Sequence, residues 1–220
     1  MVQKAKDGTP TEALEPLTAS LDFQVGADGW CRPGQVERLA SPNCDARPDG
    51  CAIDLLVIHN ISLPPGQFGG SYIADLFGNR LDYDAHPYFE QLRSLRVSSH
   101  FLILRDGAVK QFVSANDRAW HAGVSCFDGR QRCNDFSIGI ELEGTDFEPF
   151  SDVQYQALTT LTHALQLRYP LGAVAGHEHI APGRKTDPGP FFDWLQYQQA
   201  LAEYSLRALT NLSLRFPAID

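Results

Sequence analysis

The sequence has 220 residues, of which 43% are hydrophobic and 20% charged, and its formal net charge is -9. This length and composition are typical of one globular domain with a single core, and an acidic chain without a basic stripe is not expected to bind nucleic acid. No apolar run reaches the roughly 18 residues of a membrane span, and an acidic protein gains nothing from an anionic membrane surface, so no membrane partner is expected.

The N-terminal residues 1–22 have low apolar content and no sustained periodicity, which indicates a flexible tail. Their charged start is not followed by the apolar stretch of a secretory signal. The chain has five cysteines, an odd number, and no Cys-x-x-Cys pair, which argues against a disulfide framework. We therefore expect a cytoplasmic protein with reduced thiols.

The first part of the domain, residues 23–50, is rich in Gly, Pro, Asp and Arg, and we interpret it as irregular backbone that wraps a core. The apolar run at 51–58 is typical of a central strand that is buried on both faces. A loop with Pro and Gly is expected at 60–70. Short helical segments are expected at 71–78 and 86–96.

The middle of the chain has strand-like patterns. Residues 99–104 and 109–113 are expected to form a hairpin, because the connection contains Asp-Gly, which readily adopts positive φ. Residues 136–143 alternate between two faces. One face carries Phe136, Ile138, Ile140 and Leu142, and the other carries Ser137, Gly139, Glu141 and Glu143. The pattern predicts a strand whose second face is available to a site.

The last third of the chain is helical. Residues 151–168 have apolar side chains at three- and four-residue steps, and Ser151 is expected to cap their N-terminus. A final amphipathic helix is expected at 191–209, and residues 211–220 are taken as a C-terminal tail, so the domain spans 23–210. The alternation of strands and helices favours an α/β fold, a single domain with a central mixed β-sheet flanked by helices.

Two histidines and an aspartate suggest a metal site. His59 closes the apolar run, His177 follows a second short apolar segment, and Asp187 precedes a Pro-Gly pair. Three nitrogen and oxygen ligands are the ligand count of a catalytic zinc, which keeps its fourth position open for water. The pattern therefore indicates hydrolysis. Of the remaining histidines, His100 and His121 are expected at most to line the pocket, outside the ligand set.

A zinc hydrolase benefits from a base that collects the proton of water and from a cation that stabilises the oxyanion. Glu141 is the favoured base, and Glu143 is a competitor on the same strand face. Lys185 is two residues from Asp187, so in an extended segment both side chains point the same way. Taken alone, each of these charged side chains would be interpreted as a solvated residue on the surface.

Four segments resemble a known family in the correct order, and such a match is far more specific than one short motif. Residues 57–66, 118–123, 134–144 and 184–190 are similar to the cytoplasmic 1,6-anhydro-N-acetylmuramoyl-L-alanine amidases of the AmpD type, in the type 2 amidase and peptidoglycan-recognition superfamily. The resemblance covers residues 28–198. Many relatives in the superfamily have Cys at the position of Asp187, and the Asp agrees with the cytoplasmic branch.

The resemblance implies a zinc-dependent amidase of cell-wall recycling that cuts the amide between anhydro-N-acetylmuramic acid and L-alanine. It implies Zn²⁺ ligands at His59, His177 and Asp187, a general base at Glu141 and an oxyanion partner at Lys185. The substrate contacts it implies are Asn60, Arg96, Trp120 and Arg132. The expected partner is a small soluble anhydro-muropeptide, and a monomer is expected. A non-catalytic peptidoglycan-fragment receptor and an exported autolysin remain alternatives.

Overall fold

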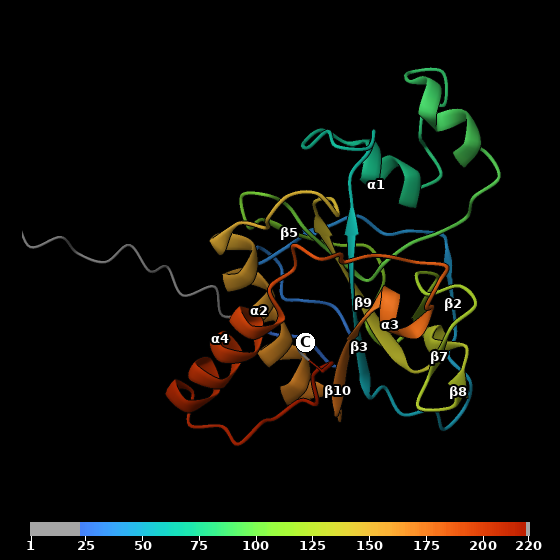
Figure 1. Cartoon of the computed structure of the whole chain (residues 1–220). Helices are drawn as coiled ribbons and strands as arrows, with labels where there is room; N and C mark the ends of the chain where they lie inside the picture. The colour runs from blue at the N-terminus through green and yellow to red at the C-terminus, as the bar shows by residue number, and fades with distance from the viewer. Residues whose placement is uncertain (1–22, 219–220) are drawn as a thin grey trace, which may run out of the picture.

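The computed structural model describes residues 23–218, so the tail expected at 1–22 lies outside the described residues. Its central element is a six-stranded sheet with the order β1-β5-β4-β9-β3-β10 (Figure 1). The strand bounds are β1 Glu37–Arg38, β3 Leu55–Ile61, β4 Phe101–Ile103, β5 Val109–Gln111, β9 Ser137–Glu143 and β10 Ala173–Gly176. Strands β4, β9, β3 and β10 run parallel, whereas β5 is antiparallel to β4. The sheet is therefore mixed, as predicted.

Strand β3 occupies the interior of the sheet between β9 and β10, which explains its apolar sequence. It begins at Leu55 and continues to Ile61, whereas the sequence predicted a strand over 51–58. The shift has a physical cause. His59 and Asn60 are polar and do not extend the apolar pattern, yet they pair in register with Glu141 and Leu142 of β9. A hydrophobicity pattern does not reveal the end of a strand when that end consists of polar residues of a site.

One face of the sheet is covered by the helices α2 (Asp152–Arg168) and α4 (Trp194–Arg207) (Figure 1). The expected cap is confirmed, because Ser151 Oγ accepts a hydrogen bond from Gln154 N and the Gln154 side chain accepts one from Ser151 N. Helix α4 is shorter than the predicted 191–209. It is joined to α2 by a buried hydrogen bond of 2.6 Å between Tyr197 and Thr162.

The opposite face is covered by short elements. These are α1 (Tyr72–Phe77), the 3-10 helices η1 (Pro87–Leu92) and η2 (Cys133–Asp135), α3 (His177–Ile180), and the two-stranded sheets β2–β6 and β7–β8. The strands of these small sheets are β2 Cys44–Asp45, β6 Arg118–Ala119, β7 Cys126–Phe127 and β8 Arg130–Gln131. The sequence did not predict these two-residue strands, because a two-residue segment carries no measurable period.

The hairpin between β4 and β5 is confirmed. Gly107 in its turn has φ +83°, and a Cβ there would lie 2.9 Å from the carbonyl oxygen of Val153. Both the turn conformation and the close approach of α2 therefore require glycine.

The C-terminal segment packs against the sheet. Arg215 N donates to Gly172 O, Val174 N donates to Arg215 O, and Phe216 packs on Tyr197. Residues 215 and 216, in the segment expected as a C-terminal tail, thus contact the sheet and α4. No helix within 23–218 combines the length and apolarity needed to cross a membrane. The five cysteines are free thiols.

Candidate metal centre and active site

The site lies where parallel strands end at one edge of the main sheet. His59 belongs to β3, and His177 directly follows the last residue of β10. Asp187 comes from the loop after α3, whose backbone is held by a hydrogen bond from Glu178 N to Asp187 O. Strand β9 places Glu141 opposite His59 in register. Ligands collect at the carboxyl ends of strands in such sheets, because that is where successive loops converge.

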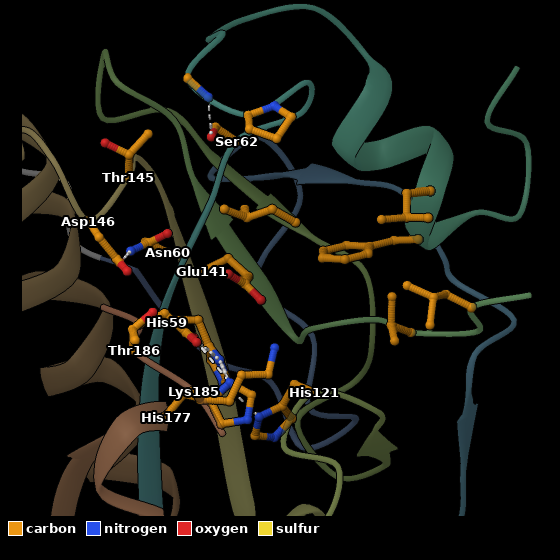
Figure 2. A pocket seen from close by; sticks show the side chains of 18 of the residues that line it. His59, Asn60, Ser62, His121, Glu141, Thr145, Asp146, His177, Lys185 and Thr186 are labelled. Carbon is orange, nitrogen blue, oxygen red and sulfur yellow. Dashed lines mark hydrogen bonds and ion pairs between the residues drawn. The ribbon is translucent and has the colours of Figure 1, made fainter. Parts of the chain in front are cut away.

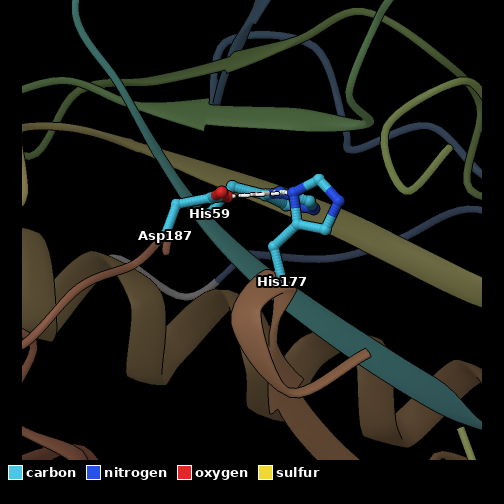
Figure 3. Close-up of side chains that lie close together, drawn as sticks. All are labelled: His59, His177 and Asp187. Carbon is cyan, nitrogen blue, oxygen red and sulfur yellow. Dashed lines mark hydrogen bonds and ion pairs between the residues drawn. The ribbon is translucent and has the colours of Figure 1, made fainter. Parts of the chain in front are cut away.

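The side chains of His59, His177 and Asp187 converge on one point (Figure 3). His59 Nδ1 lies 3.0 Å from His177 Nδ1 and 3.0 Å from Asp187 Oδ2, and His177 Nδ1 lies 3.1 Å from the same oxygen. Both histidines are buried, and the carboxylate is 15% exposed. The structure thus brings together the three ligands suggested by the sequence.

The environment of His59 and Asp187 favours the protonation states that bind a metal. Burial lowers the pKa of His59 to about 4, so the ring is neutral near pH 7. Burial alone would raise the pKa of Asp187, but hydrogen bonds with His177 and His59 outweigh it and hold the pKa below the usual range. Neutral imidazoles and an ionised carboxylate are the forms that bind a metal.

The arrangement fits a zinc-sized ion. Ligand atoms about 2.0–2.2 Å from one tetrahedral ion are separated by roughly 3.3–3.6 Å. The three atoms here, 3.0–3.1 Å apart, need to separate by only a few tenths of an ångström. His177 Nε2 lies 3.0 Å from Ala122 O, and a proton on Nε2 leaves the Nδ1 lone pair free for the metal. Two imidazoles and one carboxylate leave a fourth position open for water.

The two candidate carboxylates on β9 have different surroundings. Glu143 accepts hydrogen bonds from Gly69 N at 2.6 Å and Arg105 N at 3.2 Å, so it fastens two loops. Glu141 lies on the cavity wall, and its Oε2 is buried without a hydrogen-bond partner among residues 23–218. Burial and the nearby Asp187 raise its pKa well above the usual value, with Lys185 opposing them. Among residues 23–218, Glu141 is therefore the one of the two carboxylates that keeps a free oxygen at the cavity.

A cavity of about 690 Å³ opens in front of the ligands (Figure 2). Its wall includes the three candidate ligands together with Glu141 and Lys185. An apolar part of the wall is formed by Leu76, Phe77, Tyr88, Leu95 and Val97. A polar metal end and an apolar wall suit a ligand that combines a hydrolysable polar bond with apolar surface.

The four expected substrate contacts divide into two pairs. Asn60 and Trp120 line the cavity. Within residues 23–218, the cavity wall does not include Arg96 or Arg132. The guanidinium of Arg96 donates to the backbone carbonyls of Arg93 and Leu95, and Arg132 pairs with Asp135 with its side chain 70% exposed. The structure therefore does not bring these arginines to the cavity.

Asn60 also has a structural contact. Its Nδ2 donates to Asp146 Oδ1 at 2.6 Å and to Pro188 O at 3.0 Å. The side chain thereby ties β3 to the loop that carries Asp187, which uses both amide protons of Asn60.

His121 directly contacts the candidate ligand His59. The sequence predicted only that His121 lines the pocket at most. Its Nδ1 lies 2.9 Å from His59 Nε2, and its ring also meets His100. The contact joins residues 62 positions apart, so no local pattern could have revealed it.

Comparisons with known proteins agree with this geometry. Residues 49–190 match the N-acetylmuramoyl-L-alanine amidase family (Amidase_2). The 1,6-anhydro-N-acetylmuramyl-L-alanine amidase AmpD of Citrobacter freundii is 53% identical over 185 residues, which cover 83% of this chain and 98% of that protein.

Solved structures extend the comparison. A crystal structure of a selenomethionine AmpD derivative superposes with a TM-score of 0.75 at 53% identity and covers 79% of this chain and 97% of the other. The Escherichia coli amidase AmiD, in a complex, has a TM-score of 0.51 at 29% identity, with 81% and 65% coverage. The chain therefore belongs to the N-acetylmuramoyl-L-alanine amidase family and, within it, to the amidases of the AmpD type.

Proposed function

We propose that this chain is a zinc-dependent amidase that hydrolyses the bond between anhydro-N-acetylmuramic acid and L-alanine in soluble muropeptides, as part of cytoplasmic cell-wall recycling. The AmpD relatives carry this substrate class in their names. The AmiD structure is a complex with the substrate anhydro-N-acetylmuramic acid-L-Ala-D-gamma-Glu-L-Lys. Both observations support an anhydro-muropeptide as the substrate here.

The observation that carries the proposal is the convergence of His59 Nδ1, His177 Nδ1 and Asp187 Oδ2 within 3.1 Å of one another beside the unpartnered Glu141 Oε2. A Zn²⁺ held by these three residues would supply a Lewis acid that binds a water and lowers its pKa toward about 7. A receptor that only binds fragments has no need of a buried, unpaired base next to three ligands.

Glu141 is proposed to move the proton. Its carboxylate takes a proton from the attacking water and then delivers it to the leaving alanine nitrogen. Because burial raises its pKa, the carboxylate is a stronger base than a solvated glutamate.

Lys185 is proposed to stabilise the negative charge that develops on the amide oxygen. Its side chain extends into the cavity near Glu141 and His177 (Figure 2). Trp120, half-buried in the cavity wall, offers an apolar surface to the sugar ring. Arg96 and Arg132 take no part in this scheme, because they lie outside the described cavity wall.

The test is a turnover assay on the purified chain with defined anhydro and non-anhydro muropeptides, with and without a chelator. We expect release of the peptide from the anhydro substrate, loss of activity in chelator, and recovery with Zn²⁺. A zinc-free, inactive preparation that binds muropeptide would contradict the proposal and favour a receptor. Faster cleavage of intact sacculi than of the soluble fragment would favour an exported autolysin.

A further inference from the structure

We propose that His121 is a positioning residue for the metal site: its ring accepts the Nε2 proton of His59 and so keeps the Nδ1 lone pair of His59 directed at the metal. The inference rests on the proposed function, because it concerns the residues that would hold zinc. The side chains of His59 and His121 both line the cavity (Figure 2). Their rings meet edge to face with centroids 5.0 Å apart.

Proton accounting fixes the direction of this contact. A neutral imidazole carries one proton, so a His59 ring that binds metal through Nδ1 carries its proton on Nε2. That nitrogen lies 2.9 Å from His121 Nδ1, which must then accept. We accordingly assign the proton of His121 to Nε2, which lies 3.2 Å from Ser137 Oγ.

The chain of hydrogen bonds from His59 through His121 and Ser137 ends at a backbone carbonyl. Ser137 Oγ donates to Cys133 O at 2.6 Å, and a carbonyl oxygen cannot donate in turn. Every proton from His59 to Ser137 therefore has one place when the metal is bound. His59, His121 and Ser137 are all buried.

The location of the His121 ring explains why it supports a ligand and is not a ligand itself. Its Nδ1 faces the far nitrogen of His59, away from the point where His59, His177 and Asp187 converge. Gly139 leaves room for the ring, because a Cβ there would lie 2.6 Å from His121 Cγ. The sheet surface thus holds the ring in this place.

The neighbouring residue supports the second imidazole in the same way. Ala122 O lies 3.0 Å from His177 Nε2 and also accepts from Arg184 at 2.9 Å. The backbone N–H groups of His121 and Ala122 both donate to Asn134 Oδ1, at 3.1 and 2.8 Å. One short segment, fixed by the Asn134 side chain, therefore orients both histidine ligands.

The first experiment measures the zinc dissociation constant of purified variants by competition with a chromogenic chelator. We expect His121→Leu to weaken zinc binding about 10- to 100-fold, the usual effect of losing a hydrogen-bond partner of a ligand. In His121→Asn the side-chain oxygen takes the position of Nδ1, so zinc affinity is expected to stay close to that of the wild type. His163→Leu makes the same change at a buried histidine of α2, remote from the site, and is expected to leave zinc affinity unchanged.

The second experiment needs no variant and so does not depend on the folding of His121→Leu. In zinc-loaded wild type, ¹⁵N NMR of the imidazoles is expected to place the protons of both His59 and His121 on Nε2. A proton on His121 Nδ1 would overturn the inference. So would equal zinc affinity of His121→Leu and wild type, or a His121→Asn variant as weak as His121→Leu. Failure of the wild type to bind zinc would instead refute the proposed function.

Discussion

Glu141 and Glu143 are two residues apart on the same face of β9, and their contacts give them different chemistry. Glu143 is fully engaged by backbone N–H groups of Gly69 and Arg105. Glu141 keeps an oxygen on the cavity wall that has no hydrogen-bond partner within residues 23–218. The sequence favoured Glu141 as the general base and left Glu143 as a competitor, and the contacts that distinguish the two come from loops distant in sequence.

We expect Glu141→Gln to lower kcat by about 10²- to 10⁴-fold with zinc content unchanged, because glutamine has the same shape and cannot accept the proton. Glu143→Gln is the matched control. Its amide can accept only one of the two backbone bonds, so it is expected to lose about 1–3 kcal/mol of stability while retaining turnover per folded molecule. Metal analysis, kinetics and denaturant unfolding of both variants check this. An active Glu141→Gln beside a folded, inactive Glu143→Gln would reverse the assignment.

At the scale of the elements, β9 supports the site through a glycine. A Cβ on Gly139 would lie 2.6–2.8 Å from three atoms of the His121 ring. The backbone of Gly139 does not have positive φ, so alanine is disfavoured there by space alone. The strand therefore needs glycine at this position to seat the ring beside His59.

We expect Gly139→Ala to cost about 1–3 kcal/mol of stability, because the ring must move or the strand must shift. It should also weaken zinc binding, since the displaced ring contacts His59. Gly172→Ala is the control, because a Cβ there meets nothing within 4 Å and the backbone is not in the left-handed region. Thermal unfolding and zinc titration of both variants test the prediction. Equal behaviour of the two variants would show that the ring is not held by this contact.

The sequence predicted those elements that depend on interactions between residues close in sequence. Ser151 caps α2 through its own neighbour Gln154, and Gly107 turns the β4–β5 hairpin. The apolar side chains of β9 and α2 face each other in one core, as their periods indicated. These features depend on residues within a few positions of one another, so a single sequence is enough to find them.

Features that depend on distant contacts were not predictable. Arg47 is in a segment read only as irregular, yet its guanidinium donates to the carbonyls of Asn134, Asp135 and Ser137. Similarly, the contact of His121 with His59 arises only when β3 and the 120–123 segment fold together. The candidate metal ligands were found because their residue types are distinctive, and not because their proximity follows from spacing.

At the scale of the whole molecule, the candidate metal site connects distant parts of the chain. His59 and Asp187 are 128 positions apart and come from a central strand and a surface loop. An ion bound by all three ligands therefore favours the folded chain over the unfolded one, where no such cluster exists.

Removal of zinc is expected to lower the thermal midpoint. At a free zinc concentration about a thousandfold above the dissociation constant, binding contributes about 4 kcal/mol. Calorimetric scans with excess Zn²⁺ and with chelator measure the difference. The variant Asp187→Ala should show little shift between the two conditions. A wild-type midpoint that is the same in both would contradict a native-state zinc site at these residues.

Buried histidines also make stability depend on pH. Burial and the neighbouring Arg47 lower the pKa of His100 to about 3, and burial lowers that of His59 to about 4. In the unfolded chain both would titrate near their ordinary value of about 6.5. Below that pH the unfolded state binds protons that the folded state does not, so stability is full above about pH 6.5 and falls as the pH drops toward 4 and 3.

As the pH falls from 7 to 5, the titration of each of these two histidines is expected to lower the free energy of unfolding by about 2 kcal/mol. His100→Asn tests this for one of them, because the asparagine oxygen can still accept from Gly139 N, as His100 Nδ1 does at 3.0 Å, but cannot titrate. Its absolute stability will fall through loss of the contact with Asp117 O, so the measured quantity is the change between the two pH values. The measurement is urea unfolding in excess chelator, which removes the pH dependence of metal binding. Between pH 7 and pH 5, the free energy of unfolding of His100→Asn should fall by about 2 kcal/mol less than that of the wild type. Equal declines would mean that His100 is protonated in the folded chain at pH 5, and that Arg47 and burial do not keep it neutral.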